Sequence, residues 1–218
     1  MDSFSSDLAN KILNNYISRY ELLEKTHSQI MTLPSVMSEL NQEFDINIFK
    51  PTSHKESGRI SSYVNLLQEL PIGWRDFNEL EKSIPEIKFN SYGGQCRDGN
   101  MSGVVDLANS MNNDDLVFHV KDHGDGYGHI IYNAYACGRP TIIRSSLYRN
   151  QLAQELFNDG SCIDLDKYSN DDAIKKIKEI YINRDALDEM SFNAYKTFKH
   201  CVDFEYCAEI IYNWMGTL

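Results

Sequence analysis

The first fifty residues show two kinds of apolar spacing. Between Asp7 and Lys25 the apolar positions recur every three or four residues, which predicts an amphipathic helix. Shorter apolar runs follow, and they predict a strand at Gln29–Leu33, a helix at Ser35–Glu43 and a strand at Ile46–Phe49. Residues 51–59 are polar, contain Pro51 and Gly58, and read as a linker. We therefore expect a small N-terminal α/β lobe over residues 1–51.

From residue 60 onward, predicted strands and helices alternate along the chain. The strands are expected at Ile60–Leu67, Ile87–Tyr92, Leu116–Lys121, Thr141–Arg144 and Cys162–Leu165. The helices between them are expected at Trp74–Ser83, Val104–Met111, His129–Cys137 and Asn150–Phe157. The tail reads as helix alone, at Asp171–Ile182, Ala186–His200 and Phe204–Trp214. Alternation with short joints predicts an α/β fold with a doubly wound parallel sheet over residues 60–218, closed by a helical tail.

Composition narrows the class of protein. The chain has 218 residues, 42% of them hydrophobic, which is enough for a substantial core. Its formal net charge of -11 argues against a nucleic-acid partner, because such proteins normally present a basic face. Its five cysteines show no metal-type spacing and are expected to be reduced core residues. The acidic N-terminus resembles no leader, and no apolar run approaches the roughly 20 residues of a membrane span, so we expect a cytoplasmic protein.

The segment from Leu116 to Ile143 carries the chemistry. An apolar strand runs into a turn containing Gly124, Gly126 and Gly128, and a helix follows directly. Free amides and the helix dipole make such a helix start favourable for an anion, and ligands of α/β sheets bind outside the carboxyl ends of the strands. A phosphate-bearing ligand is therefore the functional interpretation. The alternative is that the glycines only make a tight joint.

The same segment resembles the donor site of retaining GT-B glycosyltransferases. The shared pattern is a strand, an acidic residue, Gly-aromatic-Gly, an apolar helix, Ala-x-Ala-Cys-Gly-x-Pro and an apolar strand. The family has two glutamates separated by seven residues; Asp125 and Asn133 stand at the matching positions. By this resemblance Asp125 faces the sugar or a phosphate of the donor, Gly126, Tyr127 and Gly128 line the diphosphate, and Asn133 faces the ribose. The implied fold is the Rossmann-like donor-binding domain.

The resemblance also implies a basic clamp on the diphosphate, in the loop after the first strand of the domain. Residues 62–75 of this chain contain Arg75 as their only cation. Lys121, Arg144 or Arg149, which follow predicted strands, are the candidates to replace the clamp. The alternative for each, and the more frequent one for such residues, is a solvated surface charge.

Three further positions near the predicted strand ends are candidates. The Gly93–Gly94 turn follows a strand, and by resemblance Gly94 approaches the nucleotide base; a plain turn is the alternative. His123 lies in the glycine-rich turn and is a donor-binding candidate. His119 lies inside the apolar strand, which favours a hydrogen-bonded core histidine over a catalytic base.

Asp122, His123, Asp125 and His129 are close enough in sequence to suggest a metal site. We favour an Asp- and Gly-rich turn instead, and the resemblance implies neither a bound metal nor another cofactor. The expected small molecule is a nucleoside-diphosphate sugar as substrate.

The length of the chain leaves three functions open. GT-B enzymes have two Rossmann-like domains, and residues 7–49 would match only the last part of the acceptor-binding one. The chain could transfer a sugar from a nucleoside-diphosphate sugar to an unknown acceptor, or hold a nucleotide or nucleotide sugar without turnover. The third reading is a subunit of a larger transferase assembly, in which a protein partner or a second copy replaces the missing acceptor domain.

Overall fold

The computed structural model describes residues 45–52, 58–125 and 128–216 of the chain. They fall in the second of the two units into which the chain divides, Met1–Leu40 and Asn41–Leu218. The elements expected before residue 45 lie outside the described residues. The division into a lobe at 1–51 and a domain at 60–218 therefore stays a prediction.

The strand expected at Ile46–Phe49 is wrong, because Asp45 folds this segment into a turn. Its side chain accepts a hydrogen bond from the amide of Asn47 at 2.8 Å. Its carbonyl oxygen accepts from the amides of Ile48 and Phe49, at 3.0 and 2.9 Å. An aspartate that bonds the amide two residues on competes with extended structure, so the apolar alternation in this segment does not produce a strand.

The sheet is parallel throughout and confirms the predicted fold class. Five strands lie in the order β2-β1-β3-β4-β5, and each pair of neighbours runs parallel. Their bounds are β1 Arg59–Ser62, β2 Lys88–Ser91, β3 Leu116–Phe118, β4 Thr141–Ile143 and β5 Cys162–Asp164. β1 and β3 end earlier than expected, at Ser62 and Phe118, so the residues after them are available to form loops.

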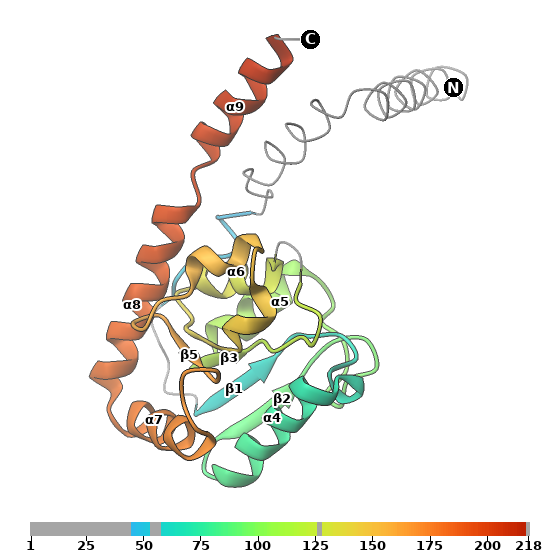
Figure 1. Cartoon of the computed structure of the whole chain (residues 1–218), viewed down its shortest axis with the longest axis vertical. Helices are drawn as coiled ribbons and strands as arrows, with labels where there is room; N and C mark the ends of the chain where they lie inside the picture. Colours follow the sequence, from blue (N-terminus) through green and yellow to red (C-terminus); the bar gives the residue numbers. More distant parts are fainter. Residues whose placement is uncertain (1–44, 53–57, 126–127, 217–218) are drawn as a thin grey trace. The chain divides into compact units, whose positions relative to one another are not determined.

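Helices cover both faces of the sheet (Figure 1). On one face lie α4 and α7, and on the other lie α5 and α6. The bounds of these helices are α4 Pro71–Ser83, α5 Val104–Asn112, α6 His129–Ala136 and α7 Asn170–Ile182. The tail continues with α8 Arg184–Cys201 and α9 Phe204–Gly216, as expected.

The segment between β4 and β5 forms 3-10 helices where an α-helix was expected. In place of the α-helix predicted at Asn150–Phe157, the chain forms two short 3-10 helices, η2 Ser145–Tyr148 and η3 Leu152–Leu156. A third, η1 Leu67–Glu69, precedes α4. Asn150 has a positive φ of 61°, a conformation that ends a helix, and it separates η2 from η3.

Local signals position the helices. Pro71 occupies the first turn of α4, where its missing amide costs no hydrogen bond. Ser169 caps α7 by accepting a hydrogen bond from the amide of Asp172 at 3.2 Å. Asn183 ends α7 and caps α8 through the amide of Ala186 at 3.4 Å. These caps explain why a continuous apolar pattern divides into separate helices.

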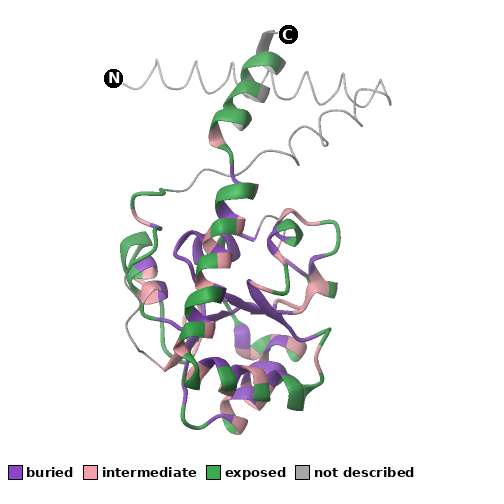
Figure 2. Cartoon of the chain, turned by 90° about the vertical axis from the view of Figure 1, so that its left-hand side faces the viewer, coloured by how far each residue is buried: buried purple, intermediate pink, exposed green. Residues whose placement is uncertain are grey.

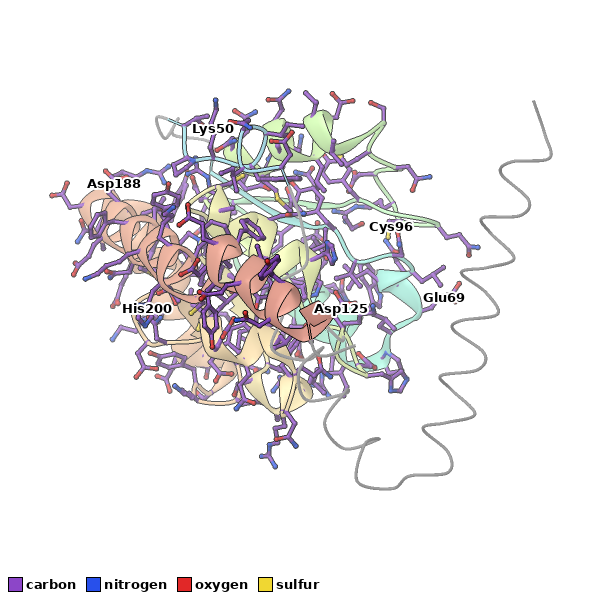
Figure 3. The ribbon with its side chains drawn as sticks, turned by 90° about the horizontal axis from the view of Figure 1, so that it is seen from above. Lys50, Glu69, Cys96, Asp125, Asp188 and His200 are labelled. Atoms are coloured by element: carbon purple, nitrogen blue, oxygen red, sulfur yellow. The ribbon has the colours of Figure 1, made fainter. Side chains whose placement is uncertain are left out.

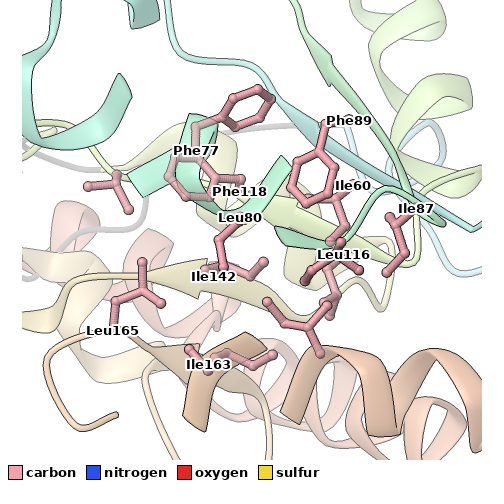
Figure 4. Close-up of a cluster of buried hydrophobic side chains, with 14 of the residues drawn as sticks. Ile60, Phe77, Leu80, Ile87, Phe89, Leu116, Phe118, Ile142, Ile163 and Leu165 are labelled. Carbon is pink, nitrogen blue, oxygen red and sulfur yellow. The ribbon is translucent and has the colours of Figure 1, made fainter. Parts of the chain in front are cut away.

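The core consists of two clusters, one on each face of the sheet. In the cluster under α4 and α7 (Figure 4), the Phe77 ring meets the rings of Phe89 and Phe118 edge to face, with centroids 5.5 and 5.2 Å apart. The other cluster joins α5 and α6 to the C-terminal half of α8. Figure 2 shows the strands as buried, while the helices expose their outer faces.

A buried polar network joins β1 to the loop that precedes β3. The carboxylate of Asp114 accepts hydrogen bonds from Arg59 Nε at 2.5 Å, from Ser61 Oγ at 2.7 Å and from the Tyr63 hydroxyl at 2.6 Å. Arg59, Ser61 and Tyr63 alternate along the chain and therefore share one side of the strand. Because a buried carboxylate needs several donors, this network holds the β1–β3 pair in a single register.

Two further expectations concern the surface and the thiols. Among the described residues, no helix combines the length and apolar character that crossing a bilayer requires.

Cys137 and Cys162 are buried free thiols, and burial raises the pKa of each to about 12. Cys137 and Cys162 are core residues, as expected, whereas Cys96 and Cys201 are only partly buried.

Replacing Phe77 tests the main core. Phe77→Ala should lower the free energy of unfolding by about 3–5 kcal/mol, because it removes a fully buried ring and leaves a cavity. Urea unfolding measures this loss. The matched control is Phe192→Ala on α8, whose side chain is 65% exposed and should change that free energy by less than about 0.5 kcal/mol. Equal losses in the two variants would contradict this description of the core.

Candidate functional site

The order of the strands reverses between β1 and β3, and we call the region outside the carboxyl ends of these two strands the crevice. The chain leaves β1 toward β2 on one side and leaves β3 toward β4 on the other. Ligands of open parallel sheets bind at such a reversal, outside the carboxyl ends of the strands. Two loops meet there. Residues 63–70 form the loop after β1, and residues 119–125 and 128 belong to the loop after β3, which also contains Gly126 and Tyr127. These two predicted site residues lie outside the described residues.

Asp125 is held from two directions. One carboxylate oxygen, Oδ2, lies 3.2 Å from Nε2 of His119, and the other, Oδ1, accepts a hydrogen bond from the ammonium group of Lys121. The Asp125 amide donates to the side-chain oxygen of Gln151 at 3.0 Å. Although burial acts to raise the pKa of the Asp125 carboxyl, the bonds from His119 and Lys121 outweigh it and hold that pKa below its ordinary value. The carboxylate is therefore ionised and fixed.

The two described glycines of the turn are required by packing. Gly124 has a φ of +70°, and a Cβ there would lie 2.6 Å from the carbonyl oxygen of Leu147. Gly128 has a φ of +83°, and a Cβ there would lie 2.8 Å from the Cβ of Ala153. The turn thus packs directly on the segment containing η2 and η3. These contacts account for Gly124 and Gly128 without a ligand.

The start of α6 has no side-chain cap. Its N-cap residue is Gly128, which has no side chain that could accept a hydrogen bond from the first turn. One turn further along α6, Asn133 is 6% exposed, and its Oδ1 atom has no hydrogen-bond partner among the described residues. Buried polar atoms in native proteins are normally paired, so an orphaned acceptor on this helix needs an explanation.

The start of α4, on the opposite side of the crevice, is already occupied. The carboxylate of Asp122 accepts hydrogen bonds from the amides of Ile72 at 3.0 Å and Gly73 at 2.9 Å. Asp122 therefore caps a helix that begins fifty residues earlier in the chain. From the sequence, Asp122 was a candidate only as a metal ligand, because nothing in the neighbouring sequence indicates a partner so distant.

Two of the arginines considered for the diphosphate clamp, Arg75 and Arg144, form internal ion pairs. Arg144 donates through Nε to Asp76, and through Nη1 to Asp166 at 3.0 Å and to the carbonyl oxygen of Leu165 at 3.2 Å. Arg75, whose side chain is 60% exposed, pairs with its neighbour Asp76 at 3.0 Å. Arg144 thus joins α4 to the ends of β4 and β5, and its side chain is 17% exposed.

The remaining predicted residues surround the crevice at different positions. Gly94 donates its amide to Asn65 Oδ1 at 2.7 Å and accepts from the amide of Leu66 at 2.9 Å, which ties the loop after β2 to the loop after β1. His123 is exposed on the turn. Figure 3 shows Asp125 on the same side of the domain as Glu69 and Cys96, which belong to those two loops, and Asp188 on the opposite side.

The structure unites some candidates and separates others. Lys121 and Asp125 are in contact, and the same turn carries His123 and leads into α6 with Gly128 and Asn133. Arg144 is engaged elsewhere. His119, expected as a hydrogen-bonded core histidine, bonds to Asp125 itself. No group of three or more His, Cys, Asp or Glu side chains that could hold a metal occurs in the described parts of the chain. The expectation that the site needs no metal stays a prediction.

A separate cavity of about 620 Å³ lies beside the amino end of β5. Its lining comes from the loop at Asp159–Gly160 and from α7 and α8, and includes Lys176, Glu179 and Met190. The residues that combine a fixed carboxylate, an uncapped helix start and an orphaned acceptor are not part of this lining. We therefore place the candidate site at the carboxyl ends of β1 and β3.

Comparison with known sequences finds no match, whereas comparison with solved structures finds similar folds. No family model and no curated protein matches the chain. TarM of S. aureus, solved with UDP, is 14% identical with a TM-score of 0.62, over 80% of this chain and 38% of TarM. Anabaena HepE in complex with UDP-glucose is 16% identical with a TM-score of 0.64, over 82% of this chain and 57% of HepE. The chain thus spans only part of the length of these two proteins.

A third similar structure is a single domain. The C-terminal domain of LpcC, a glycosyl transferase group 1 family protein from Francisella tularensis, is 11% identical with a TM-score of 0.54, over 72% of this chain and 97% of that domain. These neighbours are GT-B glycosyltransferases. The fold implied by the resemblance in sequence is confirmed: the described residues form a Rossmann-like α/β domain of the GT-B type.

The fixed carboxylate predicts a pH-dependent contribution to stability. Because the pKa of Asp125 is lowered in the folded protein, its ionised form contributes stability above the unfolded value of about 3.9, and that contribution is lost as the pH falls through the lowered pKa. The difference in unfolding free energy between the wild type and Asp125→Asn should be constant from pH 7 to 5 and shrink below pH 4. Urea unfolding across this range measures it. A difference that does not change down to pH 3 would contradict the assignment.

Proposed function

We propose that this chain binds a nucleoside-diphosphate sugar at the crevice between β1 and β3 and transfers the sugar to an acceptor. The observation that carries the proposal is the start of α6, where a glycine N-cap leaves the first turn without a side-chain cap. Helix N-termini attract phosphates because their amides and dipole both favour negative charge. At the neighbouring start of α4 the chain supplies its own anion, Asp122, which occupies the amides of Ile72 and Gly73.

Asn133 supports a ligand that carries hydroxyl groups. Its Oδ1 atom is buried and unpaired within the described part of the chain, which is costly unless a donor arrives. A ribose hydroxyl donates such a hydrogen bond, and the amide group can also donate in return. The diphosphate at the start of α6 and the ribose at Asn133 are then held by one helix.

The charges near α6 suit a ligand of high negative charge. Lys121 balances Asp125, so the carboxylate does not repel the diphosphate. Arg144 forms ion pairs with Asp76 and Asp166. Its charge is therefore offset within the protein, and its contacts stabilise the local structure. The positive potential for the phosphates thus comes from the amides and the dipole of the first turn of α6. During transfer the same groups stabilise the charge that develops on the departing diphosphate.

A second function is favoured by one observation. The internal pairing of Arg144 and the capping of α4 by Asp122 use groups that would otherwise bind the diphosphate. A chain with these groups occupied could hold a nucleotide sugar without turnover, or serve as the donor-binding part of a larger assembly. Release of UDP from UDP-glucose distinguishes sugar transfer from both of these cases, because a chain that only binds the nucleotide sugar releases no UDP.

Asn133→Leu tests the ribose contact. Leucine has nearly the same size and removes a buried unpaired acceptor, so the free energy of unfolding should stay within about 1 kcal/mol of wild type or rise. Loss of the ribose hydrogen bond should weaken the binding of UDP about tenfold. Calorimetry with UDP and UDP-glucose, together with urea unfolding, measures both quantities.

The matched control is Asn113→Leu, at the exposed end of α5, where the side chain donates only to the carbonyl oxygen of Asn109. It should leave UDP affinity unchanged. The proposal fails if the wild type shows no affinity for UDP or UDP-sugars. It also fails if Asn133→Leu destabilises the protein strongly and leaves nucleotide binding intact, because Asn133 would then serve the fold alone.

A further inference from the structure

His119 is buried behind Asp125 with its backbone fixed on both sides. Its amide donates to the carbonyl oxygen of Ile142 in β4 at 2.9 Å. Its own carbonyl oxygen accepts from the hydroxyl of Tyr148 at 3.0 Å, and the rings of His119 and Tyr148 lie 6.0 Å apart. The side chain is 1% exposed. The imidazole therefore presents one fixed edge to the glycine-rich turn.

The contacts of the two ring nitrogens determine the tautomer. Nε2 faces the ionised carboxylate of Asp125 at 3.2 Å, so it carries a proton and donates. Nδ1 is buried and has no hydrogen-bond partner among the described residues. A hydrogen-bond acceptor left unpaired in the interior disfavours folding, and apolar side chains fill the neighbouring positions of β3 at no such cost. The Nε2–H donor to Asp125 is the feature that explains a histidine here.

His119 and Lys121 act on the carboxylate in different ways. Lys121 reaches Oδ1 through a flexible side chain that is 40% exposed, and it mainly offsets the charge of Asp125. His119 reaches Oδ2 from inside the sheet through a rigid ring and therefore sets the plane of the carboxylate. Each oxygen keeps a lone pair for a further donor, because each accepts only one of these two bonds.

We propose that His119 is a positioning residue that orients the Asp125 carboxylate to accept a hydroxyl of the ligand's sugar. This inference rests on the proposed function and on the contact between Asp125 and the sugar that the resemblance implies, and it adds the residue that orients Asp125. It assigns the nucleotide to α6 and the sugar to the pair of His119 and Asp125. Loss of the orienting bond should then affect the sugar and not the nucleotide.

The experiment compares the affinity for UDP with that for UDP-glucose, UDP-galactose and UDP-N-acetylglucosamine by calorimetry. In His119→Leu the preference for the best UDP-sugar over UDP should fall about tenfold, the loss expected for one hydrogen bond to a charged group, while the affinity for UDP stays within about twofold. In His119→Gln the side-chain amide reaches the position of Nε2, so most of the preference should return. If His119 had only a general structural role, His119→Leu would weaken the binding of UDP and of the UDP-sugars equally. That result would overturn the proposal.

A second pair of variants covers the case in which leucine prevents folding. His119→Asn keeps a polar side chain but is too short to reach Asp125, so it should behave like the leucine variant and unlike His119→Gln. Equal sugar preference in the asparagine and glutamine variants would overturn the proposal. A wild type that binds UDP and prefers none of the three UDP-sugars would do the same.

Measurements without ligand separate this inference from the proposed function. NMR titration of the Asp125 carboxyl carbon should give a higher pKa in His119→Asn than in the wild type, and an unchanged pKa in His119→Gln. If the variants show this pattern but the wild type binds no nucleotide, the proposed function is refuted. The conclusion that His119 orients Asp125 then still stands. Identical titration of Asp125 in all three proteins would refute the positioning role itself.

Discussion

The pairing of β1 with β3 is the constraint on which the site depends. The two strands are parallel neighbours, with Ile60 opposite Leu116 and Ser62 opposite Phe118, and the buried Asp114 network fixes their register. Because the chain leaves them in opposite directions, the loops after them face each other across a crevice. Asp122 then crosses from the loop after β3 to the start of α4, and the two halves of the crevice become one rigid unit.

The charges around the crevice are mostly satisfied inside the protein, and this distribution defines what a ligand can meet. Asp122 is used by α4, and Arg144 is used by Asp76 and Asp166. Asp125 is oriented and balanced, so it can accept a hydrogen bond without opposing an anion. Within the described part of the chain, α6 starts after a glycine that supplies no side-chain cap, and Oδ1 of Asn133 has no hydrogen-bond partner. A ligand that joins a phosphate to hydroxyl groups matches these groups, and a nucleoside-diphosphate sugar is such a ligand.

Local patterns predicted most of the fold. The five strands and the main helices follow from apolar periodicity, which packing on both faces of a parallel sheet requires. The strand expected at Ile46–Phe49 failed because a single side chain, Asp45, supplies a competing bond that periodicity does not reveal. The helix expected after Asn150 is a 3-10 segment because the glycine-rich turn packs closely against it. Both departures come from interactions other than apolar spacing.

The candidate site could be predicted only in part. Asp125, Gly128 and Asn133 belong to one continuous motif and were found together. The bond from His119 to Asp125 spans six residues, and its signal was a histidine in an otherwise apolar strand. Ile72, which bonds Asp122, is 50 residues away from it, and Asp76, which bonds Arg144, is 68 residues away, so these contacts depend on tertiary structure. Local sequence patterns therefore could not predict these internal contacts, and the role of Arg144 toward a ligand stays a prediction.

The most direct test of the site is a titration of UDP into isotope-labelled protein, followed through backbone and side-chain amide signals. Binding at the start of α6 predicts that the amides of residues 128–131 and the side chain of Asn133 shift most. The amides of Ile72 and Gly73, held by Asp122, should shift little. Shifts centred on the cavity between α7 and α8, or on the start of α4, would contradict the assignment, as would a spectrum that UDP leaves unchanged.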